Sequence, residues 1–172
     1  AYTDGSNLAA RQAMLQAAYC AGVAFTRSYV GYVHGVAHSL GGQYGVPHGL
    51  ANAVILPYFL EEYGPACWEK LGNLAKASGL AQSSSSSEHA AKAFIAWIRQ
   101  ANRSMGIPES IPEIRAEDIP QMARHADQES NPLYPVPKLM DQTELEGIYH
   151  KLMPKEAAQW ISKPSPAPSG TI

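Results

Sequence analysis

The sequence predicts an all-α fold, a multi-helix, bundle-like domain of about six to eight helices, and three observations support this. Apolar residues recur three and four positions apart, as at Ala91, Phe94, Ile95 and Ile98, which is the spacing of one helix face. No segment shows the apolar–polar alternation of a half-buried strand. Glycine, proline and serine residues divide the chain into segments of helical length.

The composition limits the function classes. With 172 residues, 45% hydrophobic and 16% charged, the chain is long and apolar enough for a single folded core. A net charge of −2 provides no basic surface, so neither nucleic acid nor an anionic membrane is an expected partner. No apolar run reaches the roughly 20 residues of a membrane helix, and the N-terminus does not resemble a signal peptide. Cys20 and Cys67 lie in apolar, helix-like segments, which predicts two buried, reduced thiols in a cytoplasmic protein.

The N-terminal elements follow from capping signals. Residues 4–7 offer several capping side chains, and a helix is expected to begin at Leu8 and continue to about Arg27. Residues 13–26 are nearly uncharged, so this helix is predicted to be buried on most sides. A second short, buried helix is expected over 32–40, ended by Gly41-Gly42.

The remaining helices are expected at similar signals. Pro47 suits the first turn of a helix, and Ser87 is the expected cap of another. Leu145, Ile148 and Tyr149 are expected on the inner face of the last helix. The chain from Pro154 is proline-rich, so residues 1–153 are predicted to form the domain and 154–172 a disordered tail. The expected helices cover 47–63, 68–78, 88–105, 116–126 and 142–153.

A cluster of three histidines is the strongest functional signal. His34-Gly-Val-Ala-His38 places two rings one helical turn apart on the same face, and His48 follows after nine residues. Imidazole titrates near neutrality and is the commonest metal ligand. Glycines in the same stretch remove side-chain bulk, so that a ligand can come close. The cluster therefore predicts a metal site or an acid/base site.

The residues alone leave alternatives open. The three rings could instead be core histidines satisfied by hydrogen bonds, whereas the zincin motif is excluded because Gly35 stands where that motif needs Glu. Three histidines do not complete a catalytic metal site, which usually adds a carboxylate or another nitrogen and leaves one position open for substrate. Either a ligand comes from far along the chain or the missing ligands lie outside it. None of the four candidate carboxylates lies in the immediate sequence of the cluster: Asp4, Glu61, Glu62 and Asp118. The histidines expected to have no role in the site are His89, His125 and His150.

The segment from Gly31 to Pro57 closely resembles the signature of the iron-containing (group III) alcohol dehydrogenases, with His34-Gly-Val-Ala-His38 and Pro47-His48-Gly49 at its centre. The resemblance extends over about residues 1–153. Members of this family have an N-terminal α/β domain that binds NAD or NADP and an all-helical C-terminal domain that carries the metal. The resemblance implies that this chain is the C-terminal half of a dehydroquinate synthase-like fold, without the nucleotide-binding domain.

The resemblance also implies roles for single residues. In the family an Asp and three His hold the ion; His34 and His48 match the last two of these histidines. His38 matches a histidine that is not a ligand but lies beside nicotinamide and substrate, so it is the candidate catalytic proton relay. The Asp and the first His are expected upstream of Ala1, and no cofactor-binding residue is expected within this chain.

The activity that the resemblance implies belongs to the whole protein. It would oxidise small alcohols or reduce aldehydes with Fe²⁺ or Zn²⁺ and with NAD or NADP, where the metal acts as a Lewis acid. The chain alone is predicted to be inactive and to bind metal weakly.

Two rival interpretations remain. One is a helical interaction domain with structural histidines, and the other is a fragment of a related zinc enzyme, similar to glycerol dehydrogenase. If the N-terminal domain is the missing partner, an exposed apolar face is expected, with Tyr32, Leu40 and Tyr44 as candidates. The same face is a candidate surface for a homo-oligomer.

Overall fold

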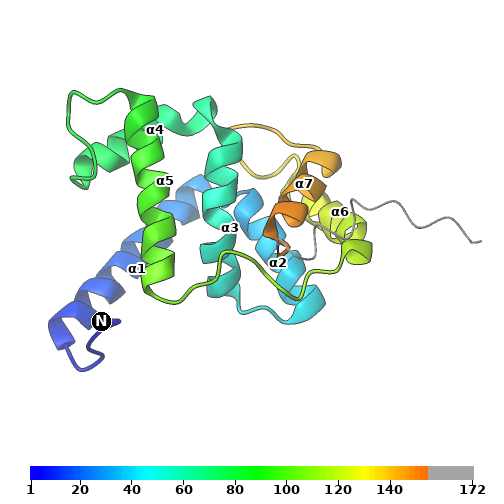
Figure 1. The fold of residues 1–172 in the computed structure, drawn as a ribbon, viewed down its shortest axis with the longest axis horizontal. Coiled ribbons are helices and arrows are strands. Elements are labelled where there is room, and N and C mark those ends of the chain that lie inside the picture. The colour runs from blue at the N-terminus through cyan, green and yellow to red at the C-terminus, as the bar shows by residue number, and fades with distance from the viewer. Residues whose placement is uncertain (155–172) are drawn as a thin grey trace, which may run out of the picture.

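The computed structural model describes residues 1–154 and confirms the all-α prediction (Figure 1). Strands are absent from this part of the chain, and none of its helices is long and apolar enough to span a membrane. Apart from Pro154, the predicted tail lies outside the described residues. The helices are α1 (Leu8–Ser28), α2 (Tyr32–Tyr44), α3 (His48–Tyr63), α4 (Pro65–Ala77), α5 (Ser87–Ser104), α6 (Ile119–Ser130) and α7 (Gln142–Leu152), with a 3-10 turn η1 (Ala116–Asp118) before α6.

Helices α2 and α3 form the centre of the domain. Helix α6 packs against α2 and α7, while α4 and α5 form a hairpin that reaches α3 from the other side (Figure 1). The predicted inner face of α7 is confirmed, because its apolar residues are fully buried. Burial of such side chains contributes roughly 1.5–3 kcal/mol each. The largest fully buried side chains include Tyr32, Leu40, Phe59, Leu145, Ile148 and Tyr149.

Helix α1 contradicts the sequence prediction of burial. None of its residues is buried, and it packs extensively against no other described helix. Leu15 and Tyr19 are each 73% exposed. The prediction that both cysteines are buried is wrong for Cys20, which lies on this exposed helix, and right for Cys67. An apolar sequence indicates that a helix packs against another element, but it does not indicate that this element lies in the same chain.

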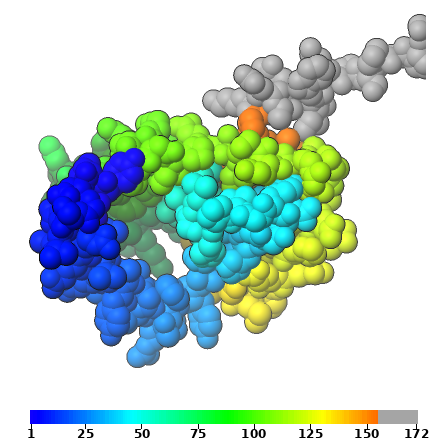
Figure 2. Space-filling view, turned by 90° about the horizontal axis from the view of Figure 1, so that it is seen from below, coloured from blue at the N-terminus to red at the C-terminus, as the bar shows by residue number. Residues whose placement is uncertain are grey.

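The exposed apolar face lies elsewhere than expected. Tyr32 and Leu40 are completely buried, and Tyr44 is only partly exposed, so these residues do not form an open face. Their side chains fill the core between α2 and its neighbours because they lie on the side of α2 that packs inward. Figure 2 shows α1 along the outer edge of the molecule, with an opening between it and the other helices. The largest group of exposed apolar side chains therefore lies on α1.

Several helix ends also differ from the predictions, since α4 begins at 65 rather than 68 and α6 spans 119–130 rather than 116–126. Two further ends show the reason. Helix α2 runs straight through Gly41-Gly42 and ends at Gly45, whose φ of 70° is the left-handed conformation that glycine favours. Ser86 rather than Ser87 caps α5, since its hydroxyl accepts a hydrogen bond from the His89 backbone N–H. In both cases the backbone conformation, rather than the residue type, decides which candidate ends the helix.

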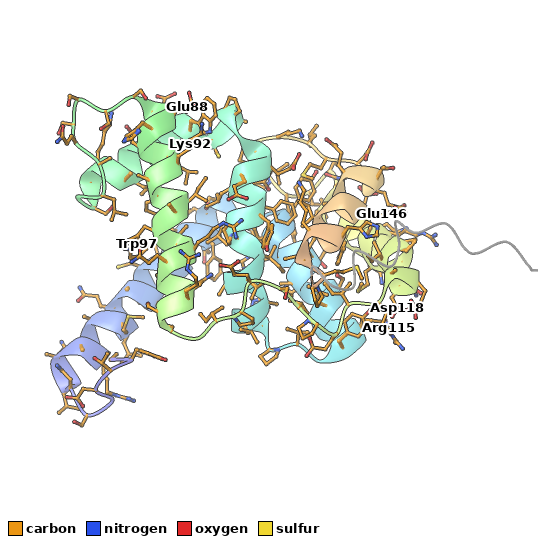
Figure 3. All side chains as sticks on the ribbon, in the orientation of Figure 1. Glu88, Lys92, Trp97, Arg115, Asp118 and Glu146 are labelled. Carbon is orange, nitrogen blue, oxygen red and sulfur yellow. The ribbon has the colours of Figure 1, made fainter. Side chains whose placement is uncertain are left out.

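Exposed ion pairs line the outer surface. Lys92 Nζ lies 2.5 Å from a carboxylate oxygen of Glu88 on α5, and Arg115 Nε lies 3.0 Å from Asp118 before α6 (Figure 3). Such exposed pairs contribute little to stability, because water and salt screen their charges.

Candidate metal and proton-transfer site

The fold brings the three predicted histidines together. His34 and His38 lie one turn apart on α2, and His48 is the first residue of α3, which begins after the short loop that follows α2. The ring centroids lie 5.3 Å apart for His34 and His48, 5.2 Å for His38 and His48, and 5.9 Å for His34 and His38. A cluster separated in sequence by a loop thus becomes a single site.

The spacing of His34 and His48 is compatible with one shared metal ion. Two imidazoles that bind an ion at about 2.1 Å in tetrahedral geometry have ring centroids about 5 Å apart, close to the observed 5.3 Å. Imidazole nitrogens suit iron, zinc, cobalt and nickel. Within residues 1–154, however, no group of three or more His, Cys, Asp or Glu is arranged to hold an ion. The two residues therefore fit the metal as part of a shell.

A carboxylate that sequence reasoning missed completes the histidine cluster. Glu129 on α6 places Oε1 2.6 Å from Nδ1 of His38, and the Tyr134 hydroxyl donates a hydrogen bond of 3.0 Å to the same oxygen. Glu129 lies 91 positions from His38. No local pattern marks it, and only the packing of α6 against α2 brings it to the site.

Gly35 allows that packing. A Cβ atom at this position would overlap Oγ of Ser130 and lie 3.3 Å from the carbonyl oxygen of Ala126, so α6 can approach α2 closely only beside glycine. Gly35 lies on α2 between His34 and His38, within one helical turn of each. The glycine of the histidine motif therefore sets the distance between the two helices that hold His38 and Glu129.

The electrostatic surroundings keep His34 neutral. Partial burial lowers the pKa of His34, and the neighbouring His48 and His38 lower it further, while the Glu129 carboxylate acts in the opposite direction. A neutral imidazole has a free lone pair for a ligand. The side chain of His38 is 43% exposed and His48 is exposed as well, an arrangement that does not fit three core histidines.

Asn52 connects the cluster to a neighbouring cavity. Its amide Nδ2 donates to Nε2 of His48 at 3.1 Å and to the His48 carbonyl oxygen at 2.8 Å. Its Oδ1 is buried and has no hydrogen-bond partner among the described residues. His34 and Asn52 line a cavity of about 520 Å³ whose other walls are mainly apolar, including Val33, Leu56 and Val136. The cavity therefore places mainly apolar side chains beside the His34 ring.

Comparisons with known proteins identify the family of the chain. Residues 1–153 match the family model described as Fe-containing alcohol dehydrogenase family, C-terminal. The chain is 36% identical over 149 residues to 1,3-propanediol dehydrogenase of Klebsiella pneumoniae, a match that covers 86% of this chain and 38% of that protein. It is 40% identical over 130 residues to alcohol dehydrogenase 4 of Saccharomyces cerevisiae (strain ATCC 204508 / S288c), covering 73% of this chain and 32% of the relative.

Solved structures give the same result. A crystal structure of 1,3-propanediol oxidoreductase superposes with a TM-score of 0.81 at 36% identity and covers 87% of this chain and 39% of that one. An alcohol dehydrogenase from Oenococcus oeni reaches a TM-score of 0.80 at 35% identity, covering 87% and 39%. The chain thus spans about two fifths of the length of these similar proteins.

Proposed function

Because this chain belongs to the Fe-containing alcohol dehydrogenase family and corresponds to its C-terminal domain, we propose that it supplies the metal-binding, substrate-side half of an enzyme that interconverts small alcohols and aldehydes. The observation that carries this proposal is the convergence of His34 and His48, with ring centroids 5.3 Å apart. An N-terminal domain outside this chain would bind NAD or NADP and provide the remaining metal ligands. A cytoplasmic location stays a prediction.

Each residue of the cluster has a distinct role in this proposal. His34 and His48 hold the ion, which we take to be Fe²⁺ or Zn²⁺; it supplies Lewis acidity to the substrate oxygen while the nicotinamide carries the hydride. His38 accepts the hydroxyl proton of the alcohol and returns it to the aldehyde in the reverse direction.

The isolated chain is proposed to be inactive. Two imidazoles make an incomplete metal shell, and this chain has no motif for a nucleotide. A nicotinamide-coupled assay with propanediol or butanol should therefore detect turnover only when the N-terminal domain is present. Turnover by the chain alone would refute this part of the proposal.

Metal binding to the histidine pair can be tested by thermal melts with and without Zn²⁺ or Fe²⁺, the latter without oxygen. An ion at 100 times its Kd stabilises the folded chain by about 2.7 kcal/mol. We expect a metal-dependent rise in Tm that disappears in both His34→Ala and His48→Ala. His150→Ala, at an exposed position on α7, is the matched control and should keep the rise.

Two outcomes would count against the proposed site. A rise in Tm that persists in His34→Ala and His48→Ala would move the ion to other residues. An absent rise, both in this chain and after an upstream segment is restored, would favour the interaction-domain interpretation with structural histidines. Metal analysis of the restored protein would also decide between iron and zinc.

A further inference from the structure

We propose that Glu129 is the positioning residue of His38: its carboxylate accepts the Nδ1 proton, holds the ring in the Nδ1–H form and leaves Nε2 as the proton acceptor. The proposal rests on the function proposed above for its consequence in catalysis, but the hydrogen bond and its effect on the ring are properties of this chain alone. Glu129 touches neither substrate nor metal in this scheme. It acts only through His38.

The geometry around His38 supports this role. The Nδ1–Oε1 distance of 2.6 Å is that of a short, charge-assisted hydrogen bond. Because a carboxylate can only accept, Nδ1 must carry the hydrogen. In the neutral ring the lone pair then resides on Nε2, which is the state that a proton acceptor needs.

Glu129 is itself held in place. The Tyr134 hydroxyl donates to Oε1 at 3.0 Å, so the carboxylate oxygen that faces His38 has a second anchor. Burial and the neighbouring Glu129 carboxylate raise the pKa of Tyr134, so the phenol remains a donor at neutral pH. Because Tyr134 already holds the carboxylate, its hydrogen bond to His38 costs less rotamer freedom than the same bond would cost in an exposed ion pair.

The pair is also accessible. The side chain of His38 is 43% exposed and that of Glu129 is 34% exposed, and the His38 and His48 rings stack with centroids 5.2 Å apart. The carboxylate approaches from α6 and the metal-binding pair lies on α2 and α3, so the ring is held between the two. This arrangement keeps the orienting group and the metal ligands on different helices.

The form of the His38 ring can be measured directly by ¹⁵N NMR of the full chain, at a pH where the ring is neutral. We expect the wild-type shifts of a protonated Nδ1 and an unprotonated Nε2. Glu129→Ala should lose this pattern and move towards the Nε2–H form that a free imidazole prefers. Glu129→Gln should keep much of it, because the amide oxygen still accepts, and Tyr134→Phe should weaken it only partly.

Glu88→Ala is the matched control, since it also removes an exposed carboxylate from an ion pair, with Lys92 on α5. It should leave the His38 signals unchanged. A wild-type ring in the Nε2–H form, or the same pattern in wild type and Glu129→Ala, would overturn the proposal. If Glu129→Ala unfolds, the wild-type spectrum alone still tests the proposal, because a ring in the Nε2–H form overturns it. Failure of the proposed metal site would appear in the melts instead, and would leave this result untouched.

Discussion

Helices α1 and α2 both carry few charged side chains but lie in opposite environments. Both were predicted to be buried. Helix α2 has five buried residues, whereas α1 has none. The difference lies in their partners: α2 packs against α3 and α6, and nothing in the described chain covers α1. An apolar helix sequence therefore predicts that the helix packs against a partner. Only the fold shows whether that partner lies in the same chain.

The first prediction contrasts the same substitution in the two helices. Leu40→Ala removes a fully buried side chain from α2 and should lower the free energy of unfolding by about 2–5 kcal/mol. Leu15→Ala on α1, where the side chain is 73% exposed, should change it by less than about 0.5 kcal/mol. Urea unfolding followed by circular dichroism measures both. A loss above about 1 kcal/mol at Leu15 would show that α1 is covered in solution, for example by a second copy of the chain.

The two cysteines offer a second contrast. Cys67 is buried and donates weakly to the carbonyl oxygens of Leu60 and Gly64, and burial raises the pKa of its thiol. Cys20 on α1 is exposed. We expect an aromatic disulfide reagent to modify Cys67 about 100-fold more slowly than Cys20, because Cys67 must first become exposed by local opening. Single Cys→Ser variants assign the fast and the slow phase of modification to the two thiols. Equal modification rates for both thiols would contradict the buried position of Cys67.

A third contrast lies within α2 itself. Gly35→Ala places a methyl group against α6 and should destabilise the fold by about 1–3 kcal/mol. Gly42→Ala on the same helix meets open space and should gain up to about 1 kcal/mol from helix propensity. Thermal melts of the two variants give the comparison.

Ser130→Ala tests why Gly35→Ala is expected to destabilise the fold. The Ser130 hydroxyl has no hydrogen-bond partner among the described residues, so its removal alone should cost little. Combined with Gly35→Ala, it should recover part of the loss, because the overlapping atom is gone. Strict additivity of the two changes would mean that the close approach of α2 and α6 does not limit position 35.

These contrasts also explain which features the sequence predicted. Helical periodicity and capping signals together predicted every helix of the described chain, and the inner face of α7 was predicted correctly because its partners lie in the same chain. Helix ends at Gly45 and Ser86 were missed by one to several residues, because more than one candidate cap was present.

The histidine cluster was predictable for a similar reason. His34 and His38 are neighbours on one helix, and His48 follows after a short loop, so local spacing already brings the rings together. Glu129 was not predictable in this way. Its place depends on the packing of α6 against α2 across 91 positions, and nothing near it in sequence distinguishes it from the other carboxylates.

The smallest expected effect concerns Glu62, an ionic link in the well-packed part of the fold. Lys151 Nζ on α7 lies 2.7 Å from its carboxylate and Lys138 Nζ lies 3.4 Å away, and the Lys151 hydrogen bond is the main cause that lowers the pKa of Glu62 below 4.5. The folded state therefore favours the ionised form. Its contribution is complete above the unfolded pKa and is lost as the pH falls through the folded one.

Glu62→Gln should therefore destabilise the chain at pH 7 by less than about 1 kcal/mol. The difference from wild type should shrink as the pH falls below about 4.5, and it should vanish once Glu62 of the wild type is protonated in both the folded and the unfolded chain. Urea unfolding at a series of pH values measures it, with Glu88→Gln on α5 as the control pair on a more exposed surface. A difference that is independent of pH would mean that Glu62 contributes through packing rather than through its charge, and that α7 is held to α3 by apolar contacts alone.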